Sequence, residues 1–138
     1  MDNNIFFHVL EPDLVPKGTV FENIDNIDNY EENSIDNIIT QDLFDYLIDD
    51  DCITILNKIK KILIPGGLVH LQGTDIKQLS IAVTFDQIST EHIKDILYPY
   101  KKNINTMAHI IQMVEACGFS VNLKKFMNVF EYYLVLEK

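Results

Sequence analysis

Acidic side chains are the most abundant groups in this sequence that could do chemistry. The consecutive carboxylates of Asp49, Asp50 and Asp51 could hold a hard cation such as Mg²⁺ or Ca²⁺, which prefers oxygen ligands. The same three residues stand directly before a helical pattern, where negative charge complements the helix dipole. We interpret them as a solvated helix start and expect no metal site.

Histidine and cysteine do not form a catalytic or metal-binding pattern. His8 and His70 each lie inside an apolar run, which favours a packed side chain over a general base. The other two histidines have no second ligand four residues away. Cys52 and Cys117 are far apart and fit no CxxC or mixed Cys/His spacing, so we expect small core residues rather than a disulfide or a zinc site. No Ser-His-Asp or phosphate-loop arrangement is discernible.

Strand-like segments dominate the first forty residues. Ile5–Leu10 is a continuous apolar run stopped by an acid and a proline, which suits a strand buried on both faces of a parallel sheet. Thr19–Ile24 is rich in β-branched and aromatic residues and predicts a second strand. Ser34–Thr40 predicts a third, and the polar segment 26–33 between them is predicted to be a surface loop.

A helical period begins near residue 49. Apolar residues from Cys52 to Leu63 recur every three or four positions and predict one buried helix face. The Pro65-Gly66-Gly67 turn ends the helix, and Leu68–Gln72 follows as a strand. This order is the second half of a βαβ unit. Residues 74–88 give no clear prediction.

The C-terminal third predicts two helices and a hairpin. One helix begins at Ser89, and another begins at Thr106 and ends before Gly118. Phe119–Leu123 and Val129–Leu136 are neighbouring apolar runs, which predict an antiparallel hairpin at one edge of the sheet. The whole pattern predicts an α/β fold with a doubly wound, mostly parallel sheet and a C-terminal antiparallel hairpin.

Composition and charge limit the function classes. The 138 residues, 47% of them hydrophobic, fit one domain spanning 1–138. The formal charge of −10 has the wrong sign for attraction to a phosphate backbone, so we expect no nucleic-acid partner. No apolar run reaches the ~18 residues of a membrane span, and the first residues lack the basic start of a signal peptide. We therefore expect a cytoplasmic protein that does not enter a membrane.

Three segments carry a resemblance to a known family. Ile55–Leu71 resembles the helix, the "LkPGG" turn and the fifth strand of class I S-adenosylmethionine-dependent methyltransferases. Glu31–Ile39 is similar to the family's entry into strand four, and Val114–Val121 to the turn before its closing hairpin. The matches keep the family's order from about residue 19 onward. The resemblance implies a Rossmann-like fold.

The resemblance also implies site residues. Asp25, after the second strand, matches the family's ribose-binding acid, and Leu10 and Glu11 would line the methionine end of S-adenosylmethionine. Thr40 and Gln41 follow the strand whose carboxyl end contacts cofactor or substrate in the family. Two alternatives stay open from the residues themselves. Asp25 lies in a polar segment with many other acids, so it can equally be a solvated loop residue. The 40–42 segment can equally provide the N-cap of a short helix at 43–47.

The sequence departs from the family at the turn after strand one. The family uses glycines there so that the backbone can approach the cofactor closely, whereas the first glycine here is Gly18. Pro12 has no N–H to donate, and Glu11 and Asp13 would repel the cofactor's carboxylate. The chain also has room for one strand where the family has two strands and two helices, which predicts a fold truncated on its N-terminal side.

Two functions follow from this mixture of match and departure. The first is a methyltransferase-like protein that has lost normal S-adenosylmethionine binding and acts as a non-catalytic interaction or accessory protein, as a homodimer or beside another protein. The second is a minimal S-adenosylmethionine-dependent methyltransferase with an altered cofactor cleft. An open cavity beside Leu10 and Asp25 would favour the enzyme, and side chains filling that space would favour the accessory protein.

Overall fold

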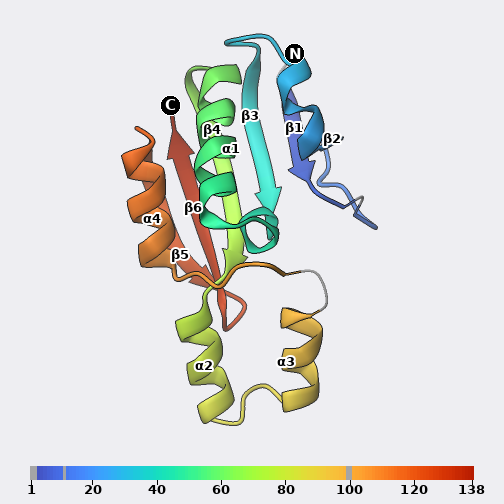
Figure 1. Ribbon diagram of the computed structural model, residues 1–138, viewed down its shortest axis with the longest axis vertical. Helices are drawn as coiled ribbons and strands as arrows, with labels where there is room; N and C mark the ends of the chain where they lie inside the picture. Colours follow the sequence, from blue (N-terminus) through green and yellow to red (C-terminus); the bar gives the residue numbers. More distant parts are fainter. Residues whose placement is uncertain (1–2, 11, 99–100) are drawn as a thin grey trace.

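The computed structural model describes residues 3–10, 12–98 and 101–138 of the chain. Six strands form one sheet in the order β2-β1-β3-β4-β6-β5 (Figure 1). Four neighbouring strands are parallel, and the last two run antiparallel to the strands beside them. The strands are β1 (Asn4–His8), β2 (Val20–Asn23), β3 (Ile35–Gln41), β4 (Leu63–Thr74), β5 (Ser120–Met127) and β6 (Glu131–Glu137).

The strand order reverses direction at β1. This central strand pairs with β2 on one side, where Ile5 is opposite Val20, and with β3 on the other, where Ile5 is opposite Ile38. Phe6 and Phe7 are almost fully buried, as expected for an apolar strand inside a parallel sheet. Because β1 and β3 are neighbours whose connections leave in opposite directions, a crevice opens at their carboxyl ends.

The hairpin predicted at one edge of the sheet is confirmed. Strand β6 pairs with β4, so that Leu71 lies opposite Leu134, and β5 forms the edge. Asn128 and Val129 in the turn both have positive φ, of 50° and 68°. Asparagine tolerates this left-handed backbone well and a β-branched valine does not, so the turn holds Val129 in a costly conformation.

Two long helices cover one face of the sheet. Helices α1 (Asp49–Ile62) and α4 (Met107–Ala116) lie side by side on the near face in Figure 1. The period predicted for α1 is confirmed, because Cys52, Leu56 and Ile59 are fully buried. They pack in one hydrophobic core with residues of β1, β3, β4 and β6. The acidic start and the lysines of its last turn complement the helix dipole.

No helix of the described segments covers the opposite face of the sheet. The helices α2 (Ile76–Thr84) and α3 (Thr90–Leu97) lie beyond the carboxyl ends of the parallel strands instead (Figure 1). On this face Phe6, Ile39 and His70 are neighbours in the strand register. Phe6 is nonetheless buried, whereas Ile39 and His70 are half-buried. The predicted α/β class and the hairpin are therefore confirmed, and the single strand between β1 and β3 is the expected truncation.

Three segments differ from the sequence prediction. Pro65-Gly66-Gly67, predicted as a turn between the helix and the next strand, lies inside β4, which begins at Leu63 directly after α1. The polar segment predicted as a loop contains a 3₁₀ helix, η1 (Ile24–Asn29), because Asn23 caps it and Ile24 and Ile27 bury their side chains three residues apart. The segment without a clear prediction contains α2, which begins at its N-cap Asp75. The short helix expected after β3 is η2 (Leu43–Tyr46), also of the 3₁₀ type.

Candidate functional site

A cavity of about 490 Å³ lies at the carboxyl ends of the first three strands. Its volume falls in the ~300–1,000 Å³ range of small-molecule sites, and aliphatic side chains and one tyrosine ring make up much of its lining. The position is the one where open α/β sheets bind ligands, outside the strand ends where the order reverses. The lining residues are Val9, Leu10, Ile24, Asp25, Tyr46, Leu47, Asp51, Thr54, Ile55 and Lys102.

Three strands each deliver residues to this first cavity through the segment that follows them. Leu10 comes after β1, Asp25 after β2, and Tyr46 and Leu47 after β3. The structure thus brings together Leu10 and Asp25, two residues that the sequence singled out. Glu11 lies outside the described residues.

Thr40 and Gln41 do not line the first cavity. Thr40 is 1% exposed and its hydroxyl is buried with no hydrogen-bond partner in the part of the chain that the structure describes. Gln41 is exposed and pairs with Gln72 in the strand register. A cofactor-binding role for these two residues stays a prediction.

His8 holds the turn after β1, where the family uses glycines. The imidazole Nδ1 lies 2.9 Å from both the backbone N and the backbone O of Leu10. Burial lowers the pKa of His8 below 6.5, against the opposing effect of its backbone hydrogen bonds to Leu10 and Gln41. A neutral Nδ1 accepts the Leu10 N–H, so this N–H is not directed to a ligand. The turn is therefore fixed by a side chain.

Asp25 lies in the first turn of η1 at the cavity wall. Its backbone N–H donates to the Asn23 side-chain oxygen at 2.9 Å, which caps the helix. The side chain is exposed, and no hydrogen bond or ion pair of the carboxylate occurs within the described residues. A carboxylate in this state can accept two hydroxyl donors from a ligand.

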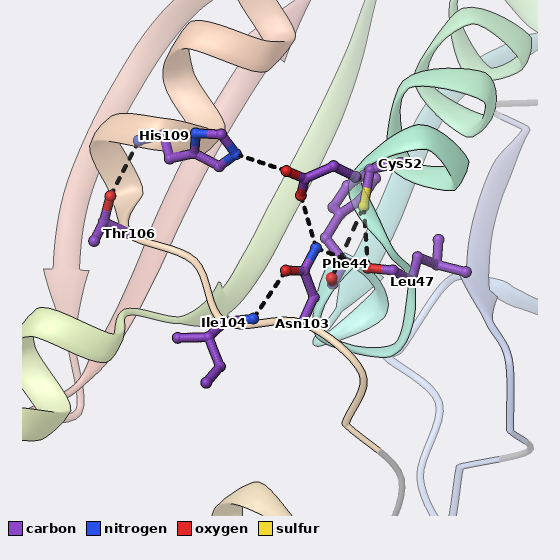
Figure 2. Close-up of polar contacts among 8 residues, drawn as sticks. Phe44, Leu47, Cys52, Asn103, Ile104, Thr106 and His109 are labelled. Atoms are coloured by element: carbon purple, nitrogen blue, oxygen red, sulfur yellow. Dashed lines mark hydrogen bonds and ion pairs between the residues drawn. The ribbon is translucent and has the colours of Figure 1, made fainter.

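Asn103 fixes Leu47, which lines the cavity (Figure 2). Its amide donates to the Leu47 carbonyl and to Asp49 Oδ1, both at 2.9 Å. The thiol of Cys52 also donates to the Leu47 carbonyl, at 3.5 Å, and burial raises the pKa of this thiol to about 12. The expected role of Cys52 as a small core residue is consistent with this place. Leu47 is thus held by a nearby group at the start of α1 and by one from a segment distant in the sequence.

Lys102 is the cation of the cavity lining, and the sequence analysis did not identify it. The Lys102 and Asn103 N–H groups both donate to the Asp45 carbonyl, at 2.8 and 3.1 Å, which fixes the 101–103 segment against η2. No spacing in the sequence relates Lys102 to Leu10 or Asp25. It is placed by tertiary structure alone.

A buried ion pair between Lys101 and Asp45 also holds the 101–103 segment against η2. Lys101 Nζ donates to Asp45 Oδ2 at 2.9 Å and to Thr74 Oγ1 at 2.7 Å. The side chains of Asp45 and Lys101 are only 2% and 13% exposed. The Thr74 N–H also donates to Asp45, at 3.2 Å. The end of β4, η2 and the segment before α4 are therefore tied at one carboxylate.

Asp42 occupies the N-cap position of η2 without capping it. Its φ is +55° and its side chain makes no cap hydrogen bond, so the expectation that this residue would serve as a good N-cap is not met. Its Oδ1 atom is buried with no partner among the described residues. Burial, and next the charge of Asp45, raise the pKa of Asp42 to about 6. The charge of Lys101 and a side-chain hydrogen bond to Gln72 offset this increase only in part.

Comparison with solved structures places the chain in a known fold. An Archaeoglobus fulgidus SAM-dependent methyltransferase matches with a TM-score of 0.70 and 10% identity, over 99% of this chain and 86% of that one. A Methanosarcina mazei SAM-dependent methyltransferase matches with 0.68 and 10%, over 99% and 92%. A chain in the complex of the Haloferax volcanii Trm112 methyltransferase activator matches with 0.69 and 12%, over 99% and 82%.

These likenesses define the fold. The chain has the class I S-adenosylmethionine-dependent methyltransferase fold, as its sequence resemblance implied. No protein-family model matches the sequence, and no curated protein is significantly similar to it.

Within residues 3–10, 12–98 and 101–138, no helix is long and apolar enough to cross a membrane. The same residues contain no group of three or more His, Cys, Asp or Glu side chains placed to hold a metal ion.

Proposed function

We propose that the chain is a minimal S-adenosylmethionine-dependent methyltransferase that binds its cofactor in the first cavity. The observation that carries this proposal is that the space beside Leu10 and Asp25 is open, and not filled by side chains. A relic of the fold kept for protein binding alone has no need for a ligand-sized cavity at the strand ends. The shared fold supports the same cofactor.

The residues of the cavity suit the parts of this cofactor. Aliphatic side chains such as Val9, Ile24 and Ile55 offer a surface for the adenine ring, and the Asp25 carboxylate accepts the ribose hydroxyls. Lys102 lines the same cavity and can pair with the methionine carboxylate, which offsets the missing glycine turn. When bound, the cofactor supplies an electrophilic methyl group on sulfur. The chain contributes mainly by holding donor and acceptor in line, which needs few acid or base groups.

Titration calorimetry with S-adenosylmethionine and S-adenosylhomocysteine tests the proposal. We expect binding tighter than ~100 μM, which corresponds to about −5.5 kcal/mol. Asp25→Asn should weaken binding by about 1–3 kcal/mol, because a charged hydrogen-bond acceptor is lost. Asp28→Asn is the matched control, since Asp28 lies in the same 3₁₀ helix and outside the cavity lining. No heat at millimolar cofactor, or equal effects of the two variants, would contradict the proposal.

A second candidate function is that of an accessory protein. The uncovered sheet face and the glycine-free turn favour it, because the first offers a surface to a partner and the second weakens the usual cofactor site. A chain in a complex with a methyltransferase activator is among the structural relatives, which makes a protein partner plausible for this fold. The partner would be a second copy of this chain or another protein.

A further inference from the structure

A second cavity, of about 330 Å³, lies next to the first. Tyr46 lines both, so the two cavities adjoin at this residue. The walls of the second cavity come from the residue after β3, the end of β4, helix α3 and the turn between β5 and β6. The lining residues are Asp42, Tyr46, Thr74, His92, Asp95, Ile96, Tyr98, Lys101, Phe130 and Glu131.

Acidic side chains outnumber basic ones in the lining of this second cavity. Three carboxylates, of Asp42, Asp95 and Glu131, face one lysine and one histidine. The ammonium of Lys101 is already paired, since it lies 2.9 Å from Asp45 Oδ2. One oxygen of Glu131 accepts from the Asn128 amide at 2.7 Å, and this neutral donor leaves the charge in place. Lys101 also acts on Asp42, whose pKa its charge lowers, so one paired lysine is shared between carboxylates and negative charge remains in excess.

The surroundings of Asp42 stabilise the charge of its carboxylate poorly. Its Oδ1 atom is buried without a hydrogen-bond partner in the described structure. Burial, and next the nearby Asp45 charge, disfavour its ionisation more than the charge of Lys101 and a Gln72 hydrogen bond favour it. An ionised carboxylate in such surroundings gains from an opposite charge placed beside it. Natural proteins keep unfavourable groups of this kind mostly where a ligand uses them.

Aromatic rings complete the lining. Tyr46, Tyr98 and Phe130 belong to three different segments and border the same space as the carboxylates. The face of an aromatic ring attracts a cation, and the attraction increases when the cation is out of water. Carboxylates together with aromatic rings select an organic cation over a hydrated metal ion, because the rings offer no oxygen ligands.

We propose that the second cavity binds the cationic amine group of a small organic ligand. In so far as that ligand is the methyl acceptor, the inference rests on the proposed function, because the acceptor would then meet the cofactor where the two cavities adjoin at Tyr46. Asp42 and Asp95 hold the ammonium group between them and the rings. An anionic acceptor is excluded by the same charges.

Three five-carbon probes of equal length test the site in the absence of cofactor. They are 1,5-diaminopentane, which is a dication, 1,5-pentanediol, which is neutral, and glutarate, which is a dianion. Calorimetry at pH 7.5 should show binding of the diamine, with the diol and glutarate at least tenfold weaker. Glutarate binding as well as the diamine, or no diamine binding with and without S-adenosylmethionine, would overturn the inference.

Charge-neutralising variants locate the site. Asp42→Asn and Asp95→Asn should each weaken diamine binding about tenfold. Asp86→Asn is the matched control, because Asp86 also has a φ of +55° but is exposed and lies outside the cavity. Diamine binding that all three variants leave unchanged would place the cation elsewhere and refute the proposal. Since Asp95 is exposed, its variant stays informative even if Asp42→Asn fails to fold.

The two proposals fail in distinguishable ways. Diamine binding without any S-adenosylmethionine binding would leave the cation site in place and refute the methyltransferase. S-adenosylmethionine binding without diamine binding would leave the methyltransferase in place and refute the cation site.

Discussion

Asp42 is a single residue whose ionised side chain destabilises the fold, and this cost is one sign of a ligand site. Its pKa of about 6 lies above the ordinary 3.8, with burial as the main cause. In the unfolded chain the carboxyl ionises from about pH 4, whereas the folded protein holds the proton until about pH 6. Ionisation of Asp42 therefore does not affect the free energy of unfolding below about pH 4. It lowers this free energy progressively between about pH 4 and pH 6, and by its full amount above about pH 6.

The Asp42→Asn variant should accordingly be more stable than the wild type at high pH. We expect a gain of up to about 3 kcal/mol in the free energy of unfolding at pH 8, and no difference at pH 3.5. Urea unfolding at both values measures it. The exposed control Asp86→Asn should show no such pH dependence. A variant less stable than the wild type at pH 8 would mean that the ionised carboxylate has a stabilising partner in the fold.

At the residue scale, the sequence identified one wall of the cofactor cavity and missed the other. Leu10 and Asp25 follow strands whose carboxyl ends must meet, so strand order alone brings them together. Lys102 and Asn103 are fixed by the backbone of Asp45. Such a contact spans more than fifty positions, as the Asp45–Lys101 pair does with a separation of 56, and leaves no local pattern. The role of His8 in the turn was likewise hidden inside an apolar run.

At the element scale, Asp75 joins two helices that are distant in sequence. Its Oδ1 accepts the Gln78 N–H at the start of α2, at 2.8 Å, and its Oδ2 accepts the Met107 N–H at the start of α4, at 2.7 Å. The residue is 2% exposed, so neither N–H can turn to water if the carboxylate is removed. One side chain thereby positions the helix below the sheet relative to the helix on its face.

Asp75→Ala should destabilise the fold by about 2–4 kcal/mol, since each lost cap costs about 1 kcal/mol and both N–H groups are left buried. Thr106→Ala removes only the bond from the His109 N–H at 3.2 Å, and should cost about 1 kcal/mol. Urea unfolding of the two variants gives the comparison. Equal losses would show that Asp75 caps one helix and not two.

Elements with a strong period were predictable, and those fixed by caps were not. Helix α1 and the hairpin follow from apolar spacing, which survives in any tertiary context. Helix α2 has Ile76, Leu79 and Ile81 on several sides, so its period is weak, and its start depends on Asp75. Helix η1 was masked by its polar composition, because only Ile24 and Ile27 anchor it.

At the scale of the whole molecule, the uncovered sheet face decides between the two candidate functions. The order and truncation of the sheet were predictable because chain length leaves no room for more strands between β1 and β3. Whether something covers the exposed side depends on a partner, which no intrachain pattern encodes. Ile39 and His70 are half-buried there by their strand neighbours alone.

If the accessory function holds through a second copy, light scattering should give twice the 16.0 kDa of the chain. Ile39→Lys should then restore the monomer mass, because a charge on the buried face costs more than the contact gains. Ile53→Lys is the control, since Ile53 is 42% exposed on α1 at the other side of the sheet. A monomer at all concentrations would remove the homodimer as an explanation.

Tyr46 belongs to the lining of both cavities, and a shared lining residue makes the binding of one ligand depend on the binding of the other. The ring also packs edge-on against His8, with centroids 5.2 Å apart, so its position is linked to the turn after β1. A ligand that fixes the ring from one side changes the shape offered on the other. By linkage, the factor by which the first ligand alters the second's affinity equals the factor in the reverse direction.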